Sequence, residues 1–268
     1  MSYYRVFGLV RSIESAAKLR VAGLIPIVGD LDQLDSLTRI AAIADVVLHF
    51  APPPAAGEID SRTRNLLAAL ASRGKLPECL VYISTSGVYG DCAGAWVSES
   101  RPPSPGTERA IRRVDAEQQV RRFARSGHVR VSILRVPGIY AAHRLPLARL
   151  ARGTPVLCAA DDVYTNHIHA DDLAHIVVLA IYRAANMRIY HASDDSELKM
   201  AAYFNLVARA FDLPQPPQIS RHQAEQQLPA SLLSFMSESR RLLNTRIKQE
   251  LRISLRYPTV ASFLEQER

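Results

Sequence analysis

The sequence predicts a doubly wound α/β fold with a mostly parallel sheet and a smaller, helix-rich C-terminal lobe. Short runs of β-branched and aromatic residues alternate with helical stretches up to about residue 192, which is the pattern of strands joined by crossover helices. Beyond that point helical segments dominate, interrupted by the Pro-rich stretch 213–218. We therefore expect a core domain over residues 1–192 and a C-terminal lobe over residues 193–268.

The first half of the chain carries the clearest strand and helix signals. Ser12 is typical of a helix N-cap and Gly23 of a helix C-terminus, so we expect a helix between the first two strands. The expected strands are Arg5–Val10, Ile25–Gly29, Asp45–Phe50, Cys79–Ser84 and Val129–Leu134, and the expected helices are 12–20, 33–43, 58–72 and 107–126. A long loop over residues 85–106 precedes the last of these helices.

The expected elements become shorter after Tyr140. They are helices over 144–152 and 171–184, strands over 155–157, 163–168 and 188–192, and mainly helix from Ser196 to the end of the chain. Such an arrangement suits a small lobe that lies over the ends of the strands.

The composition is that of an ordinary globular protein of 268 residues, with 48% apolar and 22% charged residues. Its formal net charge of +7 raises the question of a nucleic-acid partner. Arginines cluster over residues 112–125, but they alternate with Val114, Val120 and Phe123 at helical spacing. That spacing is typical of the solvent-exposed face of an amphipathic helix. Since no recognition motif accompanies the cluster, we expect no nucleic-acid binding.

Nothing in the sequence points to a membrane or to a secreted protein. No apolar run approaches the roughly 20 residues of a membrane span, and the N-terminus lacks the layout of a signal peptide. Cys79, Cys92 and Cys158 have no metal-ligand spacing, so we interpret them as reduced thiols. We expect a cytoplasmic protein whose partner is an unidentified small-molecule substrate, and we leave a homodimer open.

The stretch Cys79–Gly90, CLVYISTSGVYG, joins a strand to a cluster of hydroxyl groups. A turn through Gly87 places Ser84 and Thr85 at the carboxyl edge of the sheet, where open α/β sheets bind their ligands. The stretch resembles the active-site strand of the extended short-chain dehydrogenase/reductases, which include nucleotide-sugar epimerases and dehydratases. The resemblance implies that Thr85, four residues before Tyr89, polarises the substrate, with Ser84 as a second catalytic candidate.

Further signatures follow in the order of that family from Arg5 to about Phe263. They are Val28–Leu31 (VGDL), Val47–Ala51 (VLHFA), Leu134–Arg135 with Gly138–Tyr140, Ile168–Asp172 (IHADD), and Glu250–Leu251 with Tyr257–Pro258. Their common register implies a Rossmann-type sheet. The chain is most similar to the atypical subgroup of extended members, which keep the fold and vary the catalytic residues.

The resemblance also implies a nicotinamide dinucleotide cofactor. The implied contacts are Asp30 and Leu31 with the adenine, Ala51 and Pro52 on the nicotinamide side, and Val136, Pro137 and Gly138 close to the nicotinamide. Arg11 stands where an NAD-selecting member carries an acidic residue, and a guanidinium there can pair with the 2′-phosphate of NADP. We therefore expect NADP rather than NAD. We also expect Asp30, Ala51, Thr85 and Pro137 to face one common cleft.

The opening of the chain departs from this family. A dinucleotide-binding fold begins with a strand, a Gly-rich turn and a helix whose N-terminus receives the pyrophosphate. That unit, roughly 20–30 residues long, is absent before Arg5, so the sheet is expected to lack its first strand. We expect that the natural start codon lies further upstream, and that the cofactor needs this upstream segment. The alternative is a truncated product that binds nothing.

The catalytic pair departs from the family as well. Members use a Tyr-x-x-x-Lys pair on the helix after the long loop, with the Tyr as acid/base. By register, Arg109 stands at the Tyr position and Arg113 at the Lys position. An arginine stays protonated near neutral pH and cannot shuttle a proton, although Arg113 can still hold the nicotinamide ribose. Two functions remain open: an NADP-dependent oxidoreductase or epimerase-like enzyme with weak catalysis or an unidentified base, and a non-catalytic dinucleotide sensor or scaffold.

Two further observations concern the substrate and metals. Thr165 stands where nucleotide-sugar epimerases carry a phosphate-binding Arg, so a nucleotide sugar is not implied. His167 and His169 share one face of a strand, with Asp171 and Asp172 behind them, which is a spacing that a metal site can use. We interpret the stretch instead as a strand leading into a helix capped by Asp171 or Asp172, and we expect no metal.

Overall fold

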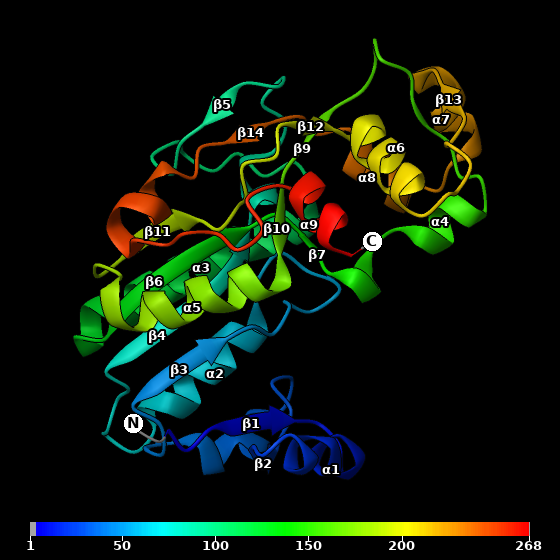
Figure 1. The fold of residues 1–268 in the computed structure, drawn as a ribbon. Helices are drawn as coiled ribbons and strands as arrows, with labels where there is room; N and C mark the ends of the chain where they lie inside the picture. Colours follow the sequence, from blue (N-terminus) through cyan, green and yellow to red (C-terminus); the bar gives the residue numbers. More distant parts are fainter. Residues whose placement is uncertain (1–3, 268) are drawn as a thin grey trace.

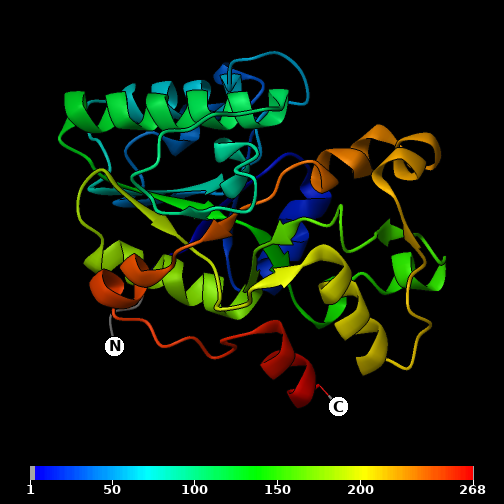
Figure 2. The same ribbon diagram turned by 90° about the horizontal axis from the view of Figure 1, so that it is seen from above.

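The computed structural model describes residues 4–267 of the chain, apart from the side chain of Ser231. Its largest sheet has four parallel strands in the order β11–β6–β4–β3, and helices cover both faces (Figures 1 and 2). This arrangement confirms the doubly wound α/β fold. None of the helices found between residues 4 and 267 is both long and apolar enough to cross a lipid bilayer.

The core elements follow the expected order along the chain. The strands are β1 (Phe7–Val10), β2 (Ile25–Val28), β3 (Val46–His49), β4 (Cys79–Thr85), β6 (Arg130–Val136), β7 (Gly138–Tyr140), β10 (His167–His169) and β11 (Arg188–His191). The helices are α1 (Ile13–Val21), α2 (Ser61–Ala71), α3 (Glu108–Gly127) and α5 (Ala170–Arg183). The side chains of Ser12, Asp60 and Thr107 cap α1, α2 and α3 by accepting a hydrogen bond from a backbone N–H of the first turn.

β4 is buried on both faces of the sheet. Leu80 and Tyr82 pack in the apolar cluster formed with α2 and α3, whereas Cys79 and Val81 pack in the cluster formed with α5. Figure 2 shows α2 and α3 on one side of the sheet and α5 on the other. Burial on both faces explains why the sequence of this strand is continuously apolar rather than alternating.

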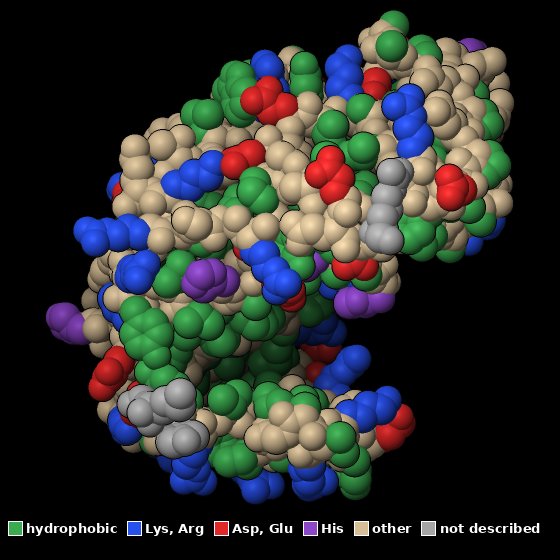
Figure 3. Space-filling view, in the orientation of Figure 1, with side chains coloured by type: hydrophobic (Ala, Val, Ile, Leu, Met, Phe, Trp, Pro, Cys, Tyr) green, Lys and Arg blue, Asp and Glu red, His purple; other side chains and the backbone are tan. Residues whose placement is uncertain are grey.

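β1 and β2 form a small sheet of their own. They pair in parallel, with Phe7 opposite Ile25 and Val10 opposite Val28, and in the described chain neither is hydrogen-bonded to β3. β3 is therefore an edge strand, and Leu48 on it is 41% exposed. We call α1, β1 and β2 the N-terminal unit. It stands apart from the rest of the molecule in Figure 1, and Figure 3 shows a hollow with hydrophobic side chains between the two parts.

The N-terminal unit is joined to the core through α2. Ile27 of β2 packs in the same apolar cluster as Leu66 and Leu70 of α2. Nearby, the side-chain amide of Asn65 donates a hydrogen bond to the carbonyl oxygen of Leu31 (2.8 Å). Side-chain contacts with α2 thus attach this unit to the core, whereas backbone hydrogen bonds join the strands within the four-stranded sheet.

The smaller lobe has an apolar cluster of its own. Its elements are α4 (Leu147–Ala151), β8 (Val156–Leu157), β9 (Tyr164–Thr165), β12 (Leu198–Lys199), α6 (Met200–Ala210), β13 (Gln218–Ile219), α7 (Arg221–Gln227), α8 (Ala230–Met236) and α9 (Val260–Gln266). Phe204 of α6 and Phe263 of α9 share the cluster with Leu150 and Val156. The core of this lobe therefore draws on residues from both sides of position 192.

Two expected helices differ from those observed. Residues 33–43 form a 3₁₀-helix, η1 (Leu34–Ile40), in place of an α-helix. Its Ser36 hydroxyl accepts a hydrogen bond from the Asp30 N–H (2.8 Å), and such local bonds compete with α-helical pairing. The helix expected over 144–152 is divided into η3 (Ala142–Arg144) and α4, because Pro146 starts the second segment.

The stretch 85–106 was expected to be a loop, but it contains ordered elements. The 3₁₀-helix η2 (Ser86–Tyr89) follows β4 directly. Further along, β5 (Trp96–Val97) pairs in parallel with β14 (Arg241–Leu242) of the C-terminal part. A two-residue strand whose partner lies this far along the chain leaves no local signal in the sequence.

The arginine cluster of α3 is not uniformly exposed, so the expectation of a solvated face is wrong for Arg112. This side chain is buried, and its guanidinium donates hydrogen bonds to the carbonyl oxygens of Ala55 (3.0 Å) and Gly57. Arg112 thereby fixes the loop that follows β3. The arginine can be buried in this way because backbone carbonyls accept from both terminal nitrogens of its guanidinium and Glu108 forms an ion pair with it (3.6 Å).

Candidate functional site

A cavity of about 660 Å³ lies at the carboxyl ends of β1, β2 and β3, and we call it the β1–β2 cavity. Five of the predicted cofactor contacts line it: Arg11, Asp30, Leu31, Ala51 and Pro52. Arg11 follows β1 and Asp30 follows β2, which run parallel and end at the same edge of their sheet, while Ala51 follows β3 of the four-stranded sheet.

One wall of the β1–β2 cavity carries positive charge. Arg62 forms an ion pair with Asp32 (2.7 Å) and donates to the carbonyl oxygen of Pro52 (3.2 Å). The hydrogen bond from Arg62 holds the pKa of Asp32 below its ordinary value. Arg11 is exposed, and its side chain has no hydrogen-bond or ion-pair partner within residues 4–267. Ser12, the N-cap of α1, lines the same wall, so the positive end of the helix dipole adds to the charge of Arg11.

A second cavity of about 670 Å³ lies between α3, the ends of β4 and β6, and the smaller lobe, and we call it the α3 cavity. Thr85, Pro137, Gly138 and Arg113 line it, and so does Arg109. Among the wall residues that were not assigned to the site from the sequence are Arg144, Arg149, Tyr164, Tyr203 and Arg240. Arg144 ends η3, Arg149, Tyr164 and Tyr203 lie on α4, β9 and α6, and Arg240 directly precedes β14, so tertiary packing sets the position of these side chains over the sheet.

The two hydroxyl groups predicted at the end of β4 have different surroundings. Thr85 faces the α3 cavity, and its Oγ1 accepts a hydrogen bond from the Gly87 N–H (3.2 Å), which leaves the hydroxyl proton available. Ser84 lies apart from both cavities. It is buried, and its hydroxyl donates to Glu117 Oε1 (2.6 Å), which also accepts from Arg135 (3.0 Å). Adjacent residues of a strand face opposite sides, and here only Thr85 faces the cavity.

Arg109 and Arg113 present guanidinium groups where the register placed the family's Tyr and Lys. Arg113 Nη1 donates to the carbonyl oxygen of Ile83 (2.8 Å) and to the hydroxyl of Tyr82 (3.0 Å). Arg113 is therefore tied to the sheet with part of its guanidinium facing the cavity. Arg109 is exposed and lies over the ring of Phe235 (4.9 Å to the centroid).

The predicted residues line two cavities and not one cleft, which corrects that expectation. Asp30 and Ala51 belong to the β1–β2 cavity, whereas Thr85 and Pro137 belong to the α3 cavity. The N-terminal unit lies beyond the edge strand β3, so its strand ends are separated from those of β4 and β6. Val136 lines neither cavity, because its side chain packs in the apolar cluster with α5.

Two buried histidines support the site without lining it. His49, at the end of β3, contacts Thr63 Oγ1 through Nε2 (2.8 Å), and burial lowers its pKa to about 3. The Thr63 hydroxyl donates to Asp60, so His49 Nε2 is the donor to Thr63. His191 has the opposite tautomer: Nδ1 donates to the Leu243 carbonyl (2.9 Å) and Nε2 accepts from the Tyr89 hydroxyl (2.6 Å). Burial lowers the pKa of His191 to about 3, and both rings stay neutral.

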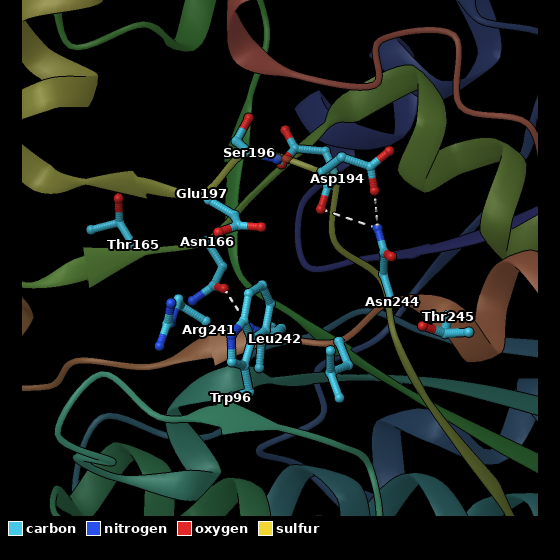
Figure 4. A pocket seen from close by; sticks show the side chains of 12 residues that line it. Trp96, Thr165, Asn166, Asp194, Ser196, Glu197, Arg241, Leu242, Asn244 and Thr245 are labelled. Carbon is cyan, nitrogen blue, oxygen red and sulfur yellow. Dashed lines mark hydrogen bonds between the residues drawn. The ribbon is translucent and has the colours of Figure 1, made fainter.

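A smaller pocket of about 170 Å³ lies beside β14 and is drawn in Figure 4. Asn244 closes one side of it by donating hydrogen bonds to Asp194 O (3.1 Å) and Asp195 Oδ1 (2.8 Å). Asn166 accepts a hydrogen bond from the Leu242 N–H (2.8 Å) on another side. None of the predicted catalytic or cofactor-binding residues lines this pocket, which is too small for a dinucleotide.

The His–Asp stretch is a strand leading into a helix. His169, rather than Asp171 or Asp172, caps α5 by accepting a hydrogen bond from the Asp171 N–H (3.2 Å). The carboxylate of Asp172 accepts from the backbone N–H groups of Arg256 and Tyr257. In the part of the chain that the structure describes, no group of three His, Cys, Asp or Glu side chains is placed to hold a metal ion.

The chain is similar in sequence to proteins without an assigned activity. An uncharacterized protein of Schizosaccharomyces pombe is 28% identical over 225 residues, which cover 79% of this chain and 74% of that protein. A functionally unknown conserved protein from Silicibacter pomeroyi has a solved structure with a TM-score of 0.81 and 27% identity, covering 98% of this chain and 88% of that chain.

Solved structures of known enzymes share the fold. UDP-glucuronic acid 4-epimerase from Bacillus cereus, in complex with NAD, has a TM-score of 0.73 and 18% identity, covering 98% of this chain and 91% of that chain. A dTDP-glucose 4,6-dehydratase from Streptomyces venezuelae, with NAD bound, has a TM-score of 0.75 and 18% identity, covering 97% and 86%. The model of the NAD dependent epimerase/dehydratase family matches residues 2–192. Since this match covers more than half of the sequence, the chain belongs to the NAD dependent epimerase/dehydratase family.

Proposed function

We propose that the protein binds a nicotinamide dinucleotide, with NADP preferred, and uses it in redox chemistry on a small molecule in the α3 cavity. The observation that carries the proposal is the arrangement of the β1–β2 cavity, where five cofactor contacts implied by the resemblance line one space. Membership of the family and the NAD bound to two structural neighbours support a nicotinamide dinucleotide.

Three residues of the β1–β2 cavity, Arg11, Asp30 and Leu31, fit the adenosine end of NADP. Arg11 and the N-terminus of α1 together would hold a 2′-phosphate, because both carry positive charge and Arg11 has no competing partner within residues 4–267. Asp30 Oδ1 already accepts from the Asp32 N–H (2.9 Å), and its other oxygen would accept from the adenine amino group. Within the described residues, neither cavity is lined by the strand–Gly-rich turn–helix unit that receives the pyrophosphate in dinucleotide-binding folds. We therefore assign no contact to the pyrophosphate.

The α3 cavity supplies the substrate side. When bound, the cofactor would supply hydride transfer. Thr85 would donate its free hydroxyl proton to a substrate carbonyl or hydroxyl oxygen, since its lone pair is already engaged by the Gly87 N–H. Arg113, held by the Ile83 carbonyl, would hold the nicotinamide ribose with the rest of its guanidinium.

A dinucleotide-binding sensor is the second candidate function. It rests on one observation, which is that the two α3 side chains facing the cavity at the family's acid/base positions are Arg109 and Arg113. Neither can exchange a proton near neutral pH. In this alternative the protein binds the cofactor and turns over no substrate.

Calorimetric titration of the full chain with NADPH and NADH tests the cofactor. We expect NADPH to bind more tightly. Arg11→Gln should cost about tenfold in NADPH affinity, which corresponds to roughly 1.4 kcal/mol for one charge-assisted contact, and should leave NADH binding unchanged. Arg20→Gln, at the opposite end of α1, is the matched control. Equal binding of the two nucleotides by the wild type would contradict the preference for NADP.

Turnover of NADPH with a panel of small carbonyl compounds separates the enzyme from the sensor. In the enzyme, Thr85→Val should lower kcat by at least a hundredfold while NADPH binding is retained, because one preorganised donor is worth about that much. Binding without turnover of any carbonyl compound would support the sensor. Unchanged turnover in Thr85→Val would exclude Thr85 from the chemistry.

A further inference from the structure

The α3 cavity carries an unusual excess of positive charge. Its charged lining consists of five arginines and one acid: Arg109, Arg113, Arg144, Arg149, Arg240 and Glu238. The cavity contains no Lys or Asp, and its net charge is therefore +4. Burial lowers the pKa of His167, also in the wall, to about 4, so this ring adds no charge at neutral pH.

Two of the five guanidinium groups are already engaged by the protein. Arg240 forms an ion pair with Glu238 (2.8 Å) and donates to the Gly90 carbonyl (2.7 Å). Arg113 donates to the sheet, as described above. These contacts hold both side chains in place, but only Arg240 has its charge compensated.

The remaining three lack an acidic partner within residues 4–267. Arg144 is exposed, and its side chain makes no hydrogen bond or ion pair in that range. Arg109 contacts only the ring of Phe235. Arg149 packs over the ring of Phe204 (4.4 Å) and donates one hydrogen bond to the Pro155 carbonyl (3.3 Å).

Arg149 shows most clearly that the described residues supply no anion to these guanidinium groups. Its Nε is buried and has no hydrogen-bond partner within residues 4–267, and burial lowers the pKa of its guanidinium. A desolvated cation without a counter-charge is costly, and bringing an anion to it recovers that cost. The neighbouring Arg144 and Arg109 line the same space.

We propose that the α3 cavity binds a small organic molecule that carries a dianionic group or two anionic groups, held by Arg144, Arg149 and Arg109. This proposal deepens the proposed function, and as a substrate assignment it rests on it. Arginine forks match both carboxylate and phosphate oxygens, so the shared chemistry is a dianion of either kind. A cavity of about 670 Å³ accommodates a metabolite of ordinary size.

Calorimetric titration without cofactor tests the proposal with two matched pairs of probes. 2-Oxoglutarate is compared with its dimethyl ester, and glucose 6-phosphate with glucose. At least one dianion should bind ten times more tightly than its neutral counterpart, and its affinity should fall as salt is raised. The pair that shows the difference identifies carboxylate or phosphate as the recognised group. Equal binding within both pairs would overturn the proposal.

Variants locate the binding. Arg144→Gln, an exposed position whose loss does not threaten folding, should weaken the dianion at least fivefold, and Arg144→Lys should restore part of the affinity. Arg152→Gln is the control, since Arg152 is exposed at the end of α4 and does not line the cavity. Equal losses in Arg144→Gln and Arg152→Gln would refute the assignment.

A final titration separates this inference from the cofactor proposal. The dianion should bind protein saturated with NADPH at least as tightly as free protein, because it contacts Arg109, Arg144 and Arg149, whereas the cofactor contacts Arg113 and the β1–β2 cavity. Competition between them would show that the arginines hold the phosphates of the dinucleotide, which overturns the substrate assignment. Failure to bind NADPH at all would reject the cofactor proposal and leave the result with the dianion intact.

Discussion

The most direct test of the packing beneath the α3 cavity is Glu117→Gln. Glu117 and Arg135 form a buried ion pair (2.7 Å), and their side chains are 4% and 2% exposed. Arg135 donates through Nε and Nη2 to the two carboxylate oxygens, and the Ser84 hydroxyl donates to one of them. Burial alone would lower the pKa of Arg135, but the hydrogen bonds and the charge of Glu117 raise it.

The expected loss follows from leaving one charge unpaired. Removing one partner of a buried ion pair costs about 3–5 kcal/mol, because the other stays desolvated without compensation. For a protein of this size that corresponds to a drop in Tm of roughly 6–20 °C. Urea unfolding followed by far-UV circular dichroism measures the free energy of unfolding. Glu14→Gln removes the same charge from an ion pair with Lys18 on α1 in which both side chains are exposed, and there we expect a loss of about 1 kcal/mol or less.

A double variant checks the reasoning independently. Glu117→Leu with Arg135→Met removes both charges, so it should be more stable than Glu117→Gln despite the larger change. A loss below about 1 kcal/mol in Glu117→Gln would refute the account. So would a double variant that is no more stable than the single one.

Three further predictions concern stability. Below about pH 6.5 the unfolded chain binds protons at three histidines that stay neutral when folded, which should cost on the order of 6 kcal/mol of stability between pH 7 and pH 5. The three are His49, His167 and His191, whose pKa values burial lowers to about 3, about 4 and about 3. Asp194, whose pKa burial raises to about 7, is one group against these three, and its protonation stabilises the folded protein as the pH falls. This protonation offsets about 2 kcal/mol of the loss, so the net loss in urea titrations should be roughly 3–4 kcal/mol. A free energy of unfolding that stays constant or rises from pH 7 to pH 5 would contradict the prediction. Tyr89→Phe removes the donor to the buried His191 Nε2 and should cost about 1–3 kcal/mol, with retention of wild-type stability as the contrary result. Gly90→Ala should reduce Tm strongly, because Gly90 has a φ of 62° and a Cβ there would clash with the carbonyl oxygen of Ser104; an unchanged Tm would show that the loop can move aside.

The strands and their ends were predictable because their signals are local. β4 differs from the predicted range only by the addition of Thr85, Ser12 caps α1 as expected, and α3 begins within one residue of its predicted start. The positions of Asp30 and Ala51 in the lining of the β1–β2 cavity were also predictable, since each closely follows a strand at the edge of the fold.

The remaining parts of the site depend on packing between distant segments. Ser84 and Thr85 are equally polar in sequence, and only the position of Glu117 on α3 shows that Ser84 is engaged in the interior. The arginines of the smaller lobe carry no motif, so Arg144 and Arg149 join the cavity only through the fold of that lobe.

The separation of the N-terminal unit from β3 has a consequence for its motions. Amide protons of Phe7–Val10 are protected by no backbone ladder to the four-stranded sheet, so they should exchange with deuterium through partial opening, well before those of β4. The β1–β2 cavity is walled by both parts of the molecule, by Arg11 on one side and Ala51 on the other. A nucleotide bound there would contact both parts and stabilise them against separation. Slower deuterium uptake by Phe7–Val10 in the presence of the nucleotide would therefore detect binding without any chemical turnover.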